Sequence, residues 1–490
     1  MAQGQPSPEA QTVGRPHRWP LLVMPENREE DTNKDSRLVN GYMEKEPQGD
    51  VWLYKRPGLK VFSRPSGGDG LGQGIYNWDG DVYSIFNGTL YKNNAFIGGT
   101  INTTNGVYRF TSVMGNGDAA AFADVPRLVF SNGLHCYEYS ATYGFQDFTL
   151  NISGTSIAPP YAKGLVYLDG FLCVMQPATA SIATSSTLVC SDDIRSPWDP
   201  LDKIIANIEP SRGVALAKQL IYIVVLKVAS TEMFYDAGNP TASPLGRVQG
   251  TKLSYGCANQ DSVRELDGKL FWLSTNENGS IQILKLEDLR LQIISTPAIE
   301  RLLGESDITS VLSWTLKYEG HVWYAITVVA ANLTLVFDVT TGLWAQWTGP
   351  DGNYLPIVSS TYNSATSQVL LQHATNGYLY VVDSAQTTDY GNAITVDIYT
   401  PNYDAGTARD KMLTTMYFDA SQQAGSTLQV RVSDDDYQSW SSFRAIDLGA
   451  KKPRLDNNGT FKRRAINFRH QSPTRFRLKS VDLQMDIGTL

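Results

Sequence analysis

Charged residues are scarce in this chain of 490 residues, of which Asp, Glu, Lys and Arg make up 18%. So small a share argues against a disordered chain or a coiled coil. Long apolar runs are missing too, since the longest, 220–226, is far too short to span a bilayer and suits a buried strand. The first 20 residues lack the apolar stretch of a signal peptide. The formal net charge of −8 excludes a chain that is basic overall and binds nucleic acid through that charge.

Cysteine is rare, with four residues that are far apart in the sequence: Cys136, Cys173, Cys190 and Cys257. No two of them form a C-x-x-C motif, which argues against structural zinc. For a protein made in a cytoplasm, we therefore expect reduced, buried thiols.

Catalytic motifs are also missing. The chain contains no G-x-S-x-G, no Walker loop and no H-E-x-x-H. Its five histidines are not paired at metal-ligand spacing: His17, His135, His321, His373 and His470. We therefore expect no catalytic residue, no metal site and no cofactor. A glycosidase needs two facing carboxylates, and the 49 acidic residues leave that alternative open.

The chain is rich in glycine, with 41 residues, and in short β-branched and aromatic runs separated by two-residue turns. Asp-Gly and Asn-Gly pairs supply the positive φ angles of tight hairpins, and they occur at Asp79-Gly80, Asn87-Gly88, Asn132-Gly133, Asp169-Gly170, Asp267-Gly268 and Asn376-Gly377. Several of these turns recur at about 50 residues, or multiples of it, which is typical of propeller blades. We expect an all-β protein with a β-propeller of about six or seven blades.

Composition changes divide the chain into three parts. Residues 1–36 are rich in proline and charge, and we expect an extended N-terminal arm there. Residues 37–392 would form the propeller, with one helical interruption at 297–303, where Thr296 and Pro297 suit a helix start. Residues 393–490 alternate like a small C-terminal β-sandwich.

Two octets share a spacing that resembles the Asp-box turn of sialidase-like propellers. They run from Ser191 to Trp198 and from Ser433 to Trp440, with Asp at the third position and Trp at the eighth. In such turns the Asp side chain bonds amides of its own turn and the Trp packs over the hairpin. We interpret both octets as structural hairpin turns rather than sugar contacts.

A basic segment near the C-terminus is the one prominent charge feature. Its members, with Asp456 as the only acid among them, are Lys451, Lys452, Arg454, Lys462, Arg463, Arg464, Arg469, Arg475, Arg477 and Lys479. Phe461, Phe468 and Phe476 interleave with them, so in alternating strands the aromatics would face inward and the cations outward. This surface is a candidate for a protein interface or a solvated face, and secondly for DNA contact.

Several motifs between residues 37 and 385 resemble the packaged-DNA stabilisation proteins, or tail hub (nozzle) proteins, of short-tailed bacteriophages. They include 37–42, 54–59, 231–239, 247–250, 256–258, 271–273, 294–300, 319–321 and 337–344, the last reading Phe-Asp-Val-Thr-Thr-Gly-Leu-Trp. Physically these residues specify strands, turns and a helix start, and none of them reads as an active site.

The resemblance implies a structural, non-enzymatic virion protein of the phage tail, made in the bacterial host cytoplasm. It implies a ring, with six copies expected, below the portal and adaptor at the head-tail joint. Such a ring closes the filled head, retains packaged DNA, surrounds double-stranded DNA during ejection and anchors tail spikes, fibres or a needle. A sialidase-like glycosidase and a glycan-binding adhesin of the virion are the two alternatives.

Overall fold

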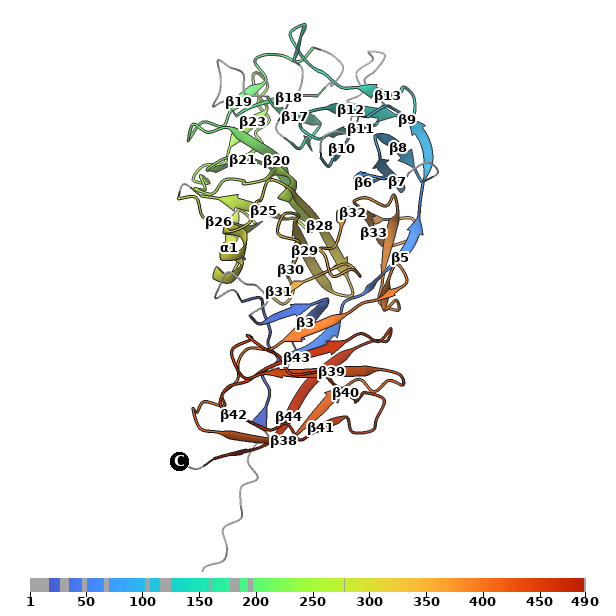
Figure 1. Ribbon diagram of the computed structural model, residues 1–490. Coiled ribbons are helices and arrows are strands. Elements are labelled where there is room, and N and C mark those ends of the chain that lie inside the picture. Colours follow the sequence, from blue (N-terminus) through green and yellow to red (C-terminus); the bar gives the residue numbers. More distant parts are fainter. Residues whose placement is uncertain are drawn as a thin grey trace, which may run out of the picture. The chain divides into compact units, whose positions relative to one another are not determined.

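The computed structural model describes residues 17–26, 35–45, 51–65, 70–101, 106–114, 125–157, 161, 163–176, 186–192, 197–276 and 278–488. Strands dominate throughout (Figure 1). The described residues hold one α-helix, α1 (Pro297–Gly304), and no helix in them has the length and apolar character needed to cross a membrane. The chain divides into two compact units, one of 56–394 with 25–32, and one of 395–490 with 1–24 and 33–55.

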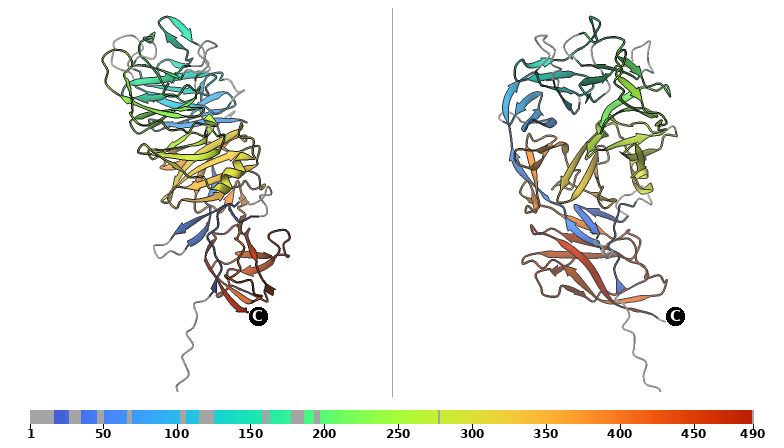
Figure 2. Two further views of the ribbon diagram at one scale, coloured as in Figure 1. Left: turned by 90° about the vertical axis from the view of Figure 1, so that its left-hand side faces the viewer. Right: turned by 180° about the vertical axis from the view of Figure 1, so that it is seen from behind.

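Six blades of the larger unit are each built from four consecutive antiparallel strands (Figure 2). They are β6 (Gly72–Trp78), β7 (Asp81–Phe86), β8 (Thr89–Lys92), β9 (Ala95–Gly98); β10 (Arg109–Val113), β11 (Arg127–Ser131), β12 (Cys136–Ser140), β13 (Gly144–Asp147); β16 (Val166–Leu168), β17 (Phe171–Met175), β18 (Thr187–Ser191), β19 (Lys203–Ile205); β20 (Gly213–Gln219), β21 (Tyr222–Lys227), β22 (Thr231–Asp236), β23 (Leu245–Arg247); β24 (Arg264–Leu266), β25 (Lys269–Thr275), β26 (Ile281–Glu287), β27 (Arg290–Ile293); β28 (Val311–Tyr318), β29 (His321–Val328), β30 (Leu333–Asp338), β31 (Leu343–Gln346).

A seventh, composite sheet closes the ring. Its strands β32 (Ile357–Asn363), β33 (Gln368–His373) and β34 (Leu379–Asp383) are followed by β5 (Gly58–Ser63), which comes from the start of the unit. β5 runs antiparallel to β34, with Asp383 opposite Gly58. Small hairpins lie beside the blades: β14 (Leu150–Ile152) with β15 (Thr155–Ile157), and β35 (Thr388–Asp389) with β36 (Asn392–Ala393). The predicted β-propeller is confirmed, with its two chain ends joined in one sheet.

The hairpin turns follow the predicted chemistry. Asp79 and Gly80 both have positive φ, 50° and 83°, and the Asn87, Asp169 and Asp267 turns behave in the same way. At Asn132-Gly133 and Asn376-Gly377 only the glycine has positive φ. There the asparagine side chain instead accepts backbone N–H groups two or three residues ahead. The helix also forms where expected, since the Thr296 side chain accepts the Ile299 N–H.

Apolar side chains pack between neighbouring blades and make up the propeller core. Phe271 of β25 stacks on Tyr324 of β29, with ring centroids 5.0 Å apart. Phe337 packs against Trp344 at the turn of their hairpin. Each blade therefore buries its faces against the next one, as a ring of sheets requires.

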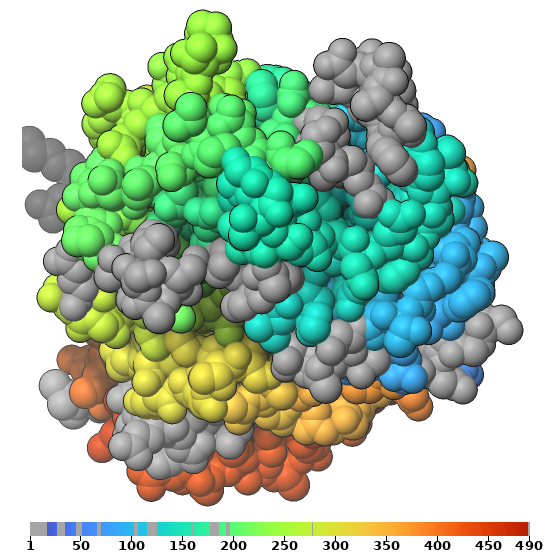
Figure 3. All heavy atoms as spheres, turned by 90° about the horizontal axis from the view of Figure 1, so that it is seen from above, coloured from blue at the N-terminus to red at the C-terminus, as the bar shows by residue number. Residues whose placement is uncertain are grey.

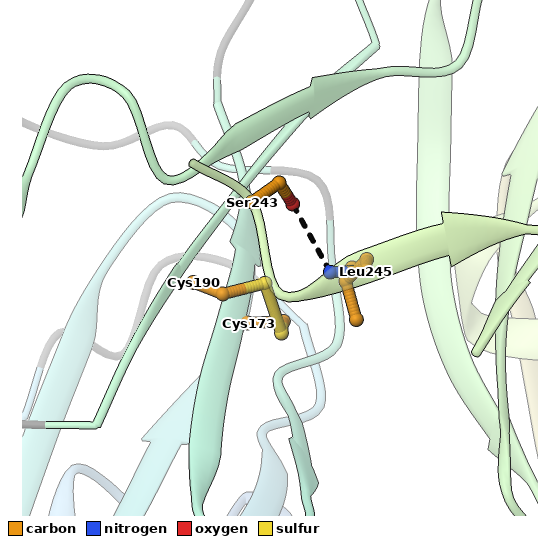
Figure 4. Close-up of a disulfide and its surroundings, with 4 residues drawn as sticks. All are labelled: Cys173, Cys190, Ser243 and Leu245. Atoms are coloured by element: carbon orange, nitrogen blue, oxygen red, sulfur yellow. Dashed lines mark hydrogen bonds between the residues drawn. A yellow bond between two sulfur atoms is a disulfide. The ribbon is translucent and has the colours of Figure 1, made fainter. Parts of the chain in front are cut away.

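Our expectation of four reduced thiols is wrong for Cys173 and Cys190. They lie opposite each other on β17 and β18, with Cα atoms 4.2 Å apart, and a disulfide joins them (Figure 4). Facing residues of antiparallel strands bring two side chains within bonding reach, which residue spacing alone does not reveal. Figure 3 views the molecule from the side of residues 125–250, turquoise to green, which include this blade. Cys136 and Cys257 are free, buried thiols, as expected.

The smaller unit contains two runs of paired strands. One is β3 (Gly41–Lys45), β4 (Val51–Lys55), β44 (Arg477–Ile487), β38 (Lys411–Ala420) and β41 (Arg454–Asp456), with β1 (His17–Arg18) beside β44 and β42 (Thr460–Phe461) beside β38. The other is β2 (Arg37–Val39), β37 (Val396–Tyr399), β43 (Ala465–His470), β39 (Thr427–Ser433) and β40 (Arg444–Asp447). Phe418 of the first run packs edge-on against Phe468 of the second. The β-sandwich that we expect over 393–490 stays a prediction.

The units divide the chain differently from our expected boundaries at 36/37 and 392/393. Residues 37–55, which we placed in the propeller, pair with C-terminal strands through β2 and β4. The described part of the expected arm is anchored as well. His17 pairs with Leu483 on β44, and Trp19, Leu21 and Val23 are buried. Local patterns could not show this, because these partners are more than 350 residues away. Residues 1–16 and 27–34 of the arm lie outside the described residues.

Candidate functional surfaces

The ten basic residues of the C-terminal segment differ in exposure. Arg464 is buried, and Arg469 and Lys479 are half-buried. The other seven are exposed: Lys451, Lys452, Arg454, Lys462, Arg463, Arg475 and Arg477. The interleaved Phe461, Phe468 and Phe476 are all buried. Inward aromatics and outward cations are therefore the dominant pattern, as the alternation indicated.

The exposed cations do not form one continuous stripe, because the segments that carry them pair with different ends of strand β38. Arg454 lies opposite Tyr417 near one end of β38, and Pro453 accepts the Phe418 N–H. Phe461, just before Lys462, lies opposite Lys411 at the other end. A strand of this length extends for roughly 30 Å. The segment thus supplies two smaller basic patches: a first patch of Lys451, Lys452 and Arg454, and a second patch of Lys462 and Arg463.

Two members of the segment have structural partners. Arg464 forms a two-point ion pair with Asp434, at 2.6 and 2.8 Å, and donates to the backbone oxygen of Asn458. Arg469 donates to Asp397 at 2.8 Å. Burial lowers the pKa of Arg469, whereas its hydrogen bond and charge interaction with Asp397 raise it, with a net rise. Arg464 and Arg469 therefore hold the C-terminal unit together and are not available to a partner.

Aromatic rings beneath other cations shape the same unit. Arg477 lies over the Tyr54 ring, 5.1 Å from its centroid, and Lys479 lies over Trp52 at 5.2 Å. Tyr42 stacks on Tyr54 in turn. Such stacking fixes long side chains in place and leaves their charged ends at the surface. Lys451, Lys452, Lys462 and Arg475 form no ion pair with any residue that the structure describes.

A cavity of about 460 Å³ lies at the centre of the propeller. The innermost strand of every blade contributes to its lining, namely β6, β10, β16, β20, β24, β28 and β32. Its cationic lining residues are Arg109, Lys163, Lys218 and Arg264, and Glu265 is the one carboxylate among the described lining residues. A glycosidase needs two facing carboxylates, so this lining does not supply the pair that the alternative requires.

Lys163, one of these lining residues, forms an ion pair with Asp261, which is not part of the lining. Burial lowers the pKa of Lys163, and the charge of Asp261 opposes that shift. Arg109 donates to the backbone oxygen of Asp261 at 3.0 Å, and burial lowers its pKa too. Sequence reasoning missed all of these residues, because each comes from a different blade and no motif connects them.

The two octets lie in different units of the chain, and only the second octet is described in full. Asp435 accepts hydrogen bonds from the Ser439 hydroxyl, the Ser439 N–H and the Ser433 hydroxyl within its own turn, and these bonds lower its pKa to about 2. This local bonding agrees with a structural hairpin turn. The octet lies between β39 and β40, in the smaller unit and outside the propeller. In the first octet Trp198 is buried near Phe148, while 193–196 lie outside the described residues.

The motifs that carry the resemblance lie on scaffold elements. Thr231–Asp236 is strand β22, and Phe271, Trp272 and Leu273 are buried in β25. In the turn after Phe337, Asp338 accepts the Thr340 N–H through its side chain and the Gly342 N–H through its backbone. None of these residues forms a cluster with the chemistry of a catalytic site. Among the described residues, no three His, Cys, Asp or Glu side chains gather as a metal site would require.

Comparison with known proteins gives one family match. The model described as "Phage_stabilise: Bacteriophage P22 Gp10, beta-propeller" matches residues 26–352, more than half of the chain. The comparison with curated proteins gives no match. Among solved structures, the N-terminal domain of Nup159 is 10% identical, with a TM-score of 0.38 over 71% of this chain and 98% of that one. YCF48 from Cyanidioschyzon merolae is 9% identical, with a TM-score of 0.38 over 67% and 99%.

Proposed function

The chain belongs to the phage packaged-DNA stabilisation family of β-propeller proteins, and on that premise we propose that it is the tail hub, or nozzle, of a short-tailed phage. In this role it forms a ring, with six copies expected, below the portal and adaptor. The ring closes the filled head, retains packaged DNA and surrounds the DNA as it leaves. It also anchors tail spikes, fibres or a needle. The family is a structural one, and the proposal involves no catalytic step.

The observation that best supports a mechanical role is the composite seventh blade. β5 joins β34, so the two ends of the propeller are held in one sheet. Buried Arg56 forms an ion pair with buried Asp389, which also accepts the Leu59 N–H at 3.0 Å at the start of β5. A ring of sheets closed in this way has few free strand edges and resists opening. A protein that must withstand the pressure of packaged DNA needs both of these properties.

The exposed basic patches supply the proposed contacts with neighbours. Their side chains are separated from the buried arginines that stabilise the unit, so they can be changed without loss of the fold. A basic patch recognises either an acidic protein surface or DNA phosphates. We place the first patch, Lys451, Lys452 and Arg454, against an acidic neighbour at the head-tail joint.

Charge reversal tests this placement. Lys451→Glu/Lys452→Glu and Lys462→Glu/Arg463→Glu alter one patch each, and Lys203→Glu on outer strand β19 is a matched control. We expect the first double variant to remain folded but to add poorly to filled heads in a reconstitution assay. DNA in those heads should become sensitive to nuclease. Normal addition of that variant would contradict the placement of the patch.

The family role itself has a separate test. Particles assembled without this chain should package DNA and then lose it, and added wild-type protein should restore retention. Electron microscopy of complete virions should show a ring of propellers around the exit channel. Full heads that retain DNA without the chain would overturn the proposed function, whatever the patch variants do.

A further inference from the structure

The central cavity of the propeller carries more positive charge than its surroundings neutralise. Four cations line it, whereas Glu265 is the one carboxylate in the described lining and Asp261 pairs with the lining residue Lys163, which leaves a net charge of +2. Asp261 is engaged by Lys163. Glu265 accepts the Gly268 N–H within its own hairpin at 3.1 Å. Arg109 shares the charge of Asp261 with Lys163, whereas Lys218 and Arg264 have no carboxylate partner among the described residues.

Arg264 makes this imbalance costly. The residue is 8% exposed, and its Nε and Nη2 donate to the backbone oxygens of Ser313 and Val358, at 2.7 and 3.1 Å. Its buried Nη1 has no hydrogen-bond partner among the described residues. An arginine keeps its charge in proteins, so it cannot relieve its burial by losing a proton. A buried charge without a counter-charge is unfavourable, and an anion is the complement that satisfies it.

We propose that the central cavity is a binding site for a small oxyanion, held by Arg264 with Arg109 and Lys218. Three blades contribute these cations, from β24, β10 and β20, so the site exists only in the closed ring. Guanidinium groups bind phosphate and carboxylate oxygens by two-point hydrogen bonds. The cavity volume of about 460 Å³ is within the range of small-molecule sites, which leaves room for the group that carries the oxyanion. The site does not depend on the role of the chain in a tail.

Lys218 provides the variant that tests the site with least risk to the fold. Its side chain is exposed, and its Nζ donates to the backbone oxygen of Tyr167 at 3.2 Å. Lys218→Met removes one cation from the cavity. Lys203→Met, an exposed lysine on outer strand β19, is the matched control. Arg264→Gln removes the central cation and is the stronger but less conservative change.

The experiment is a calorimetric titration of the full chain with inorganic phosphate, and separately with acetate, at constant ionic strength. We expect saturable binding of one anion per chain to the wild type and to Lys203→Met. The dissociation constant should rise about threefold in Lys218→Met and tenfold or more in Arg264→Gln, if the latter folds. Tighter binding of phosphate than of acetate would assign a phosphate group, and the reverse order a carboxylate. No saturable binding of either anion, or equal binding by Lys218→Met and wild type, would overturn the proposal.

Discussion

Arg464 and Asp434 form an ion pair in which the arginine side chain is 3% exposed and the aspartate side chain 44%. The arginine also donates to the backbone oxygen of Asn458 at 2.6 Å and lies 4.5 Å from the centroid of the Phe461 ring. Arg464 therefore supplies a hydrogen bond to a buried backbone oxygen of the C-terminal unit, while Asp434 remains hydrated. Its neighbour Arg463 is exposed, so two adjacent arginines have opposite roles.

This contrast predicts opposite effects of two substitutions. Arg464→Met should lower the free energy of unfolding by about 3 kcal/mol, the lower part of the range for broken buried pairs, because Asp434 can stay hydrated. Arg463→Met should have little effect, since its ion pair with Asp436 is exposed. Urea denaturation followed by fluorescence measures both. Equal stabilities of the two variants would show that Arg464 is not structural.

The closure of the propeller gives a second prediction. Arg56→Met leaves Asp389 buried with the Leu59 N–H but without its cation, and should destabilise the larger unit by about 4 kcal/mol. Arg64→Met, on an exposed arginine after β5, is the matched control and should change stability by less than about 0.5 kcal/mol. Thermal unfolding of both variants checks this. If Arg56→Met melts at the wild-type temperature, the pair does not secure the closing strand.

Buried histidines predict a loss of stability in mild acid. Burial lowers the pKa of His470 to about 3 and that of His373 to about 4, below the usual 6.5. Below pH 6.5 the unfolded chain binds protons that the folded chain does not, so stability falls as the pH drops toward the folded pKa values. Each histidine contributes a slope of up to about 1.4 kcal/mol per pH unit.

Thermal unfolding between pH 7.5 and 4 measures this slope. His470→Gln should weaken the pH dependence of the smaller unit and leave that of the larger unit unchanged. The reverse should hold for His373→Gln. A wild-type chain whose stability is constant down to pH 5 would contradict the buried neutral state of both rings.

The Cys173–Cys190 disulfide predicts a thiol count that differs from the four reduced cysteines expected from the sequence. Unfolding the chain in denaturant without reductant should expose two thiols to alkylation, Cys136 and Cys257, and adding reductant should expose all four. The bridge joins residues 17 apart, so its loss should lower the free energy of unfolding by about 3 kcal/mol. Mass spectrometry of the alkylated peptides gives the count. Four labelled cysteines without reductant would restore the reduced state that we first expected.

The turns and helix α1 were predictable because their determinants are local. Asp79-Gly80 and three of its counterparts adopt positive φ angles that few other residue pairs tolerate, and Thr296 with Pro297 favours a helix start. Inward and outward faces of the C-terminal strands followed from alternation around Phe461, Phe468 and Phe476. The separate roles of Arg463 and Arg464 were not visible, because they depend on where Asp434 lies.

Local chemistry in the chain was sufficient for the strand class, the turns and the approximate blade period, and the resemblance of its motifs indicated the family. Long-range pairing governs the rest. β5 closes the ring with a partner more than 300 residues away, Cys173 and Cys190 meet through strand register, and residues 37–55 join C-terminal strands. The cluster of Arg109, Lys218 and Arg264 likewise exists only because a closed ring turns one strand of each blade toward a common centre. No pattern within a single strand encodes such convergence, since each cation taken alone is an ordinary residue of its own blade.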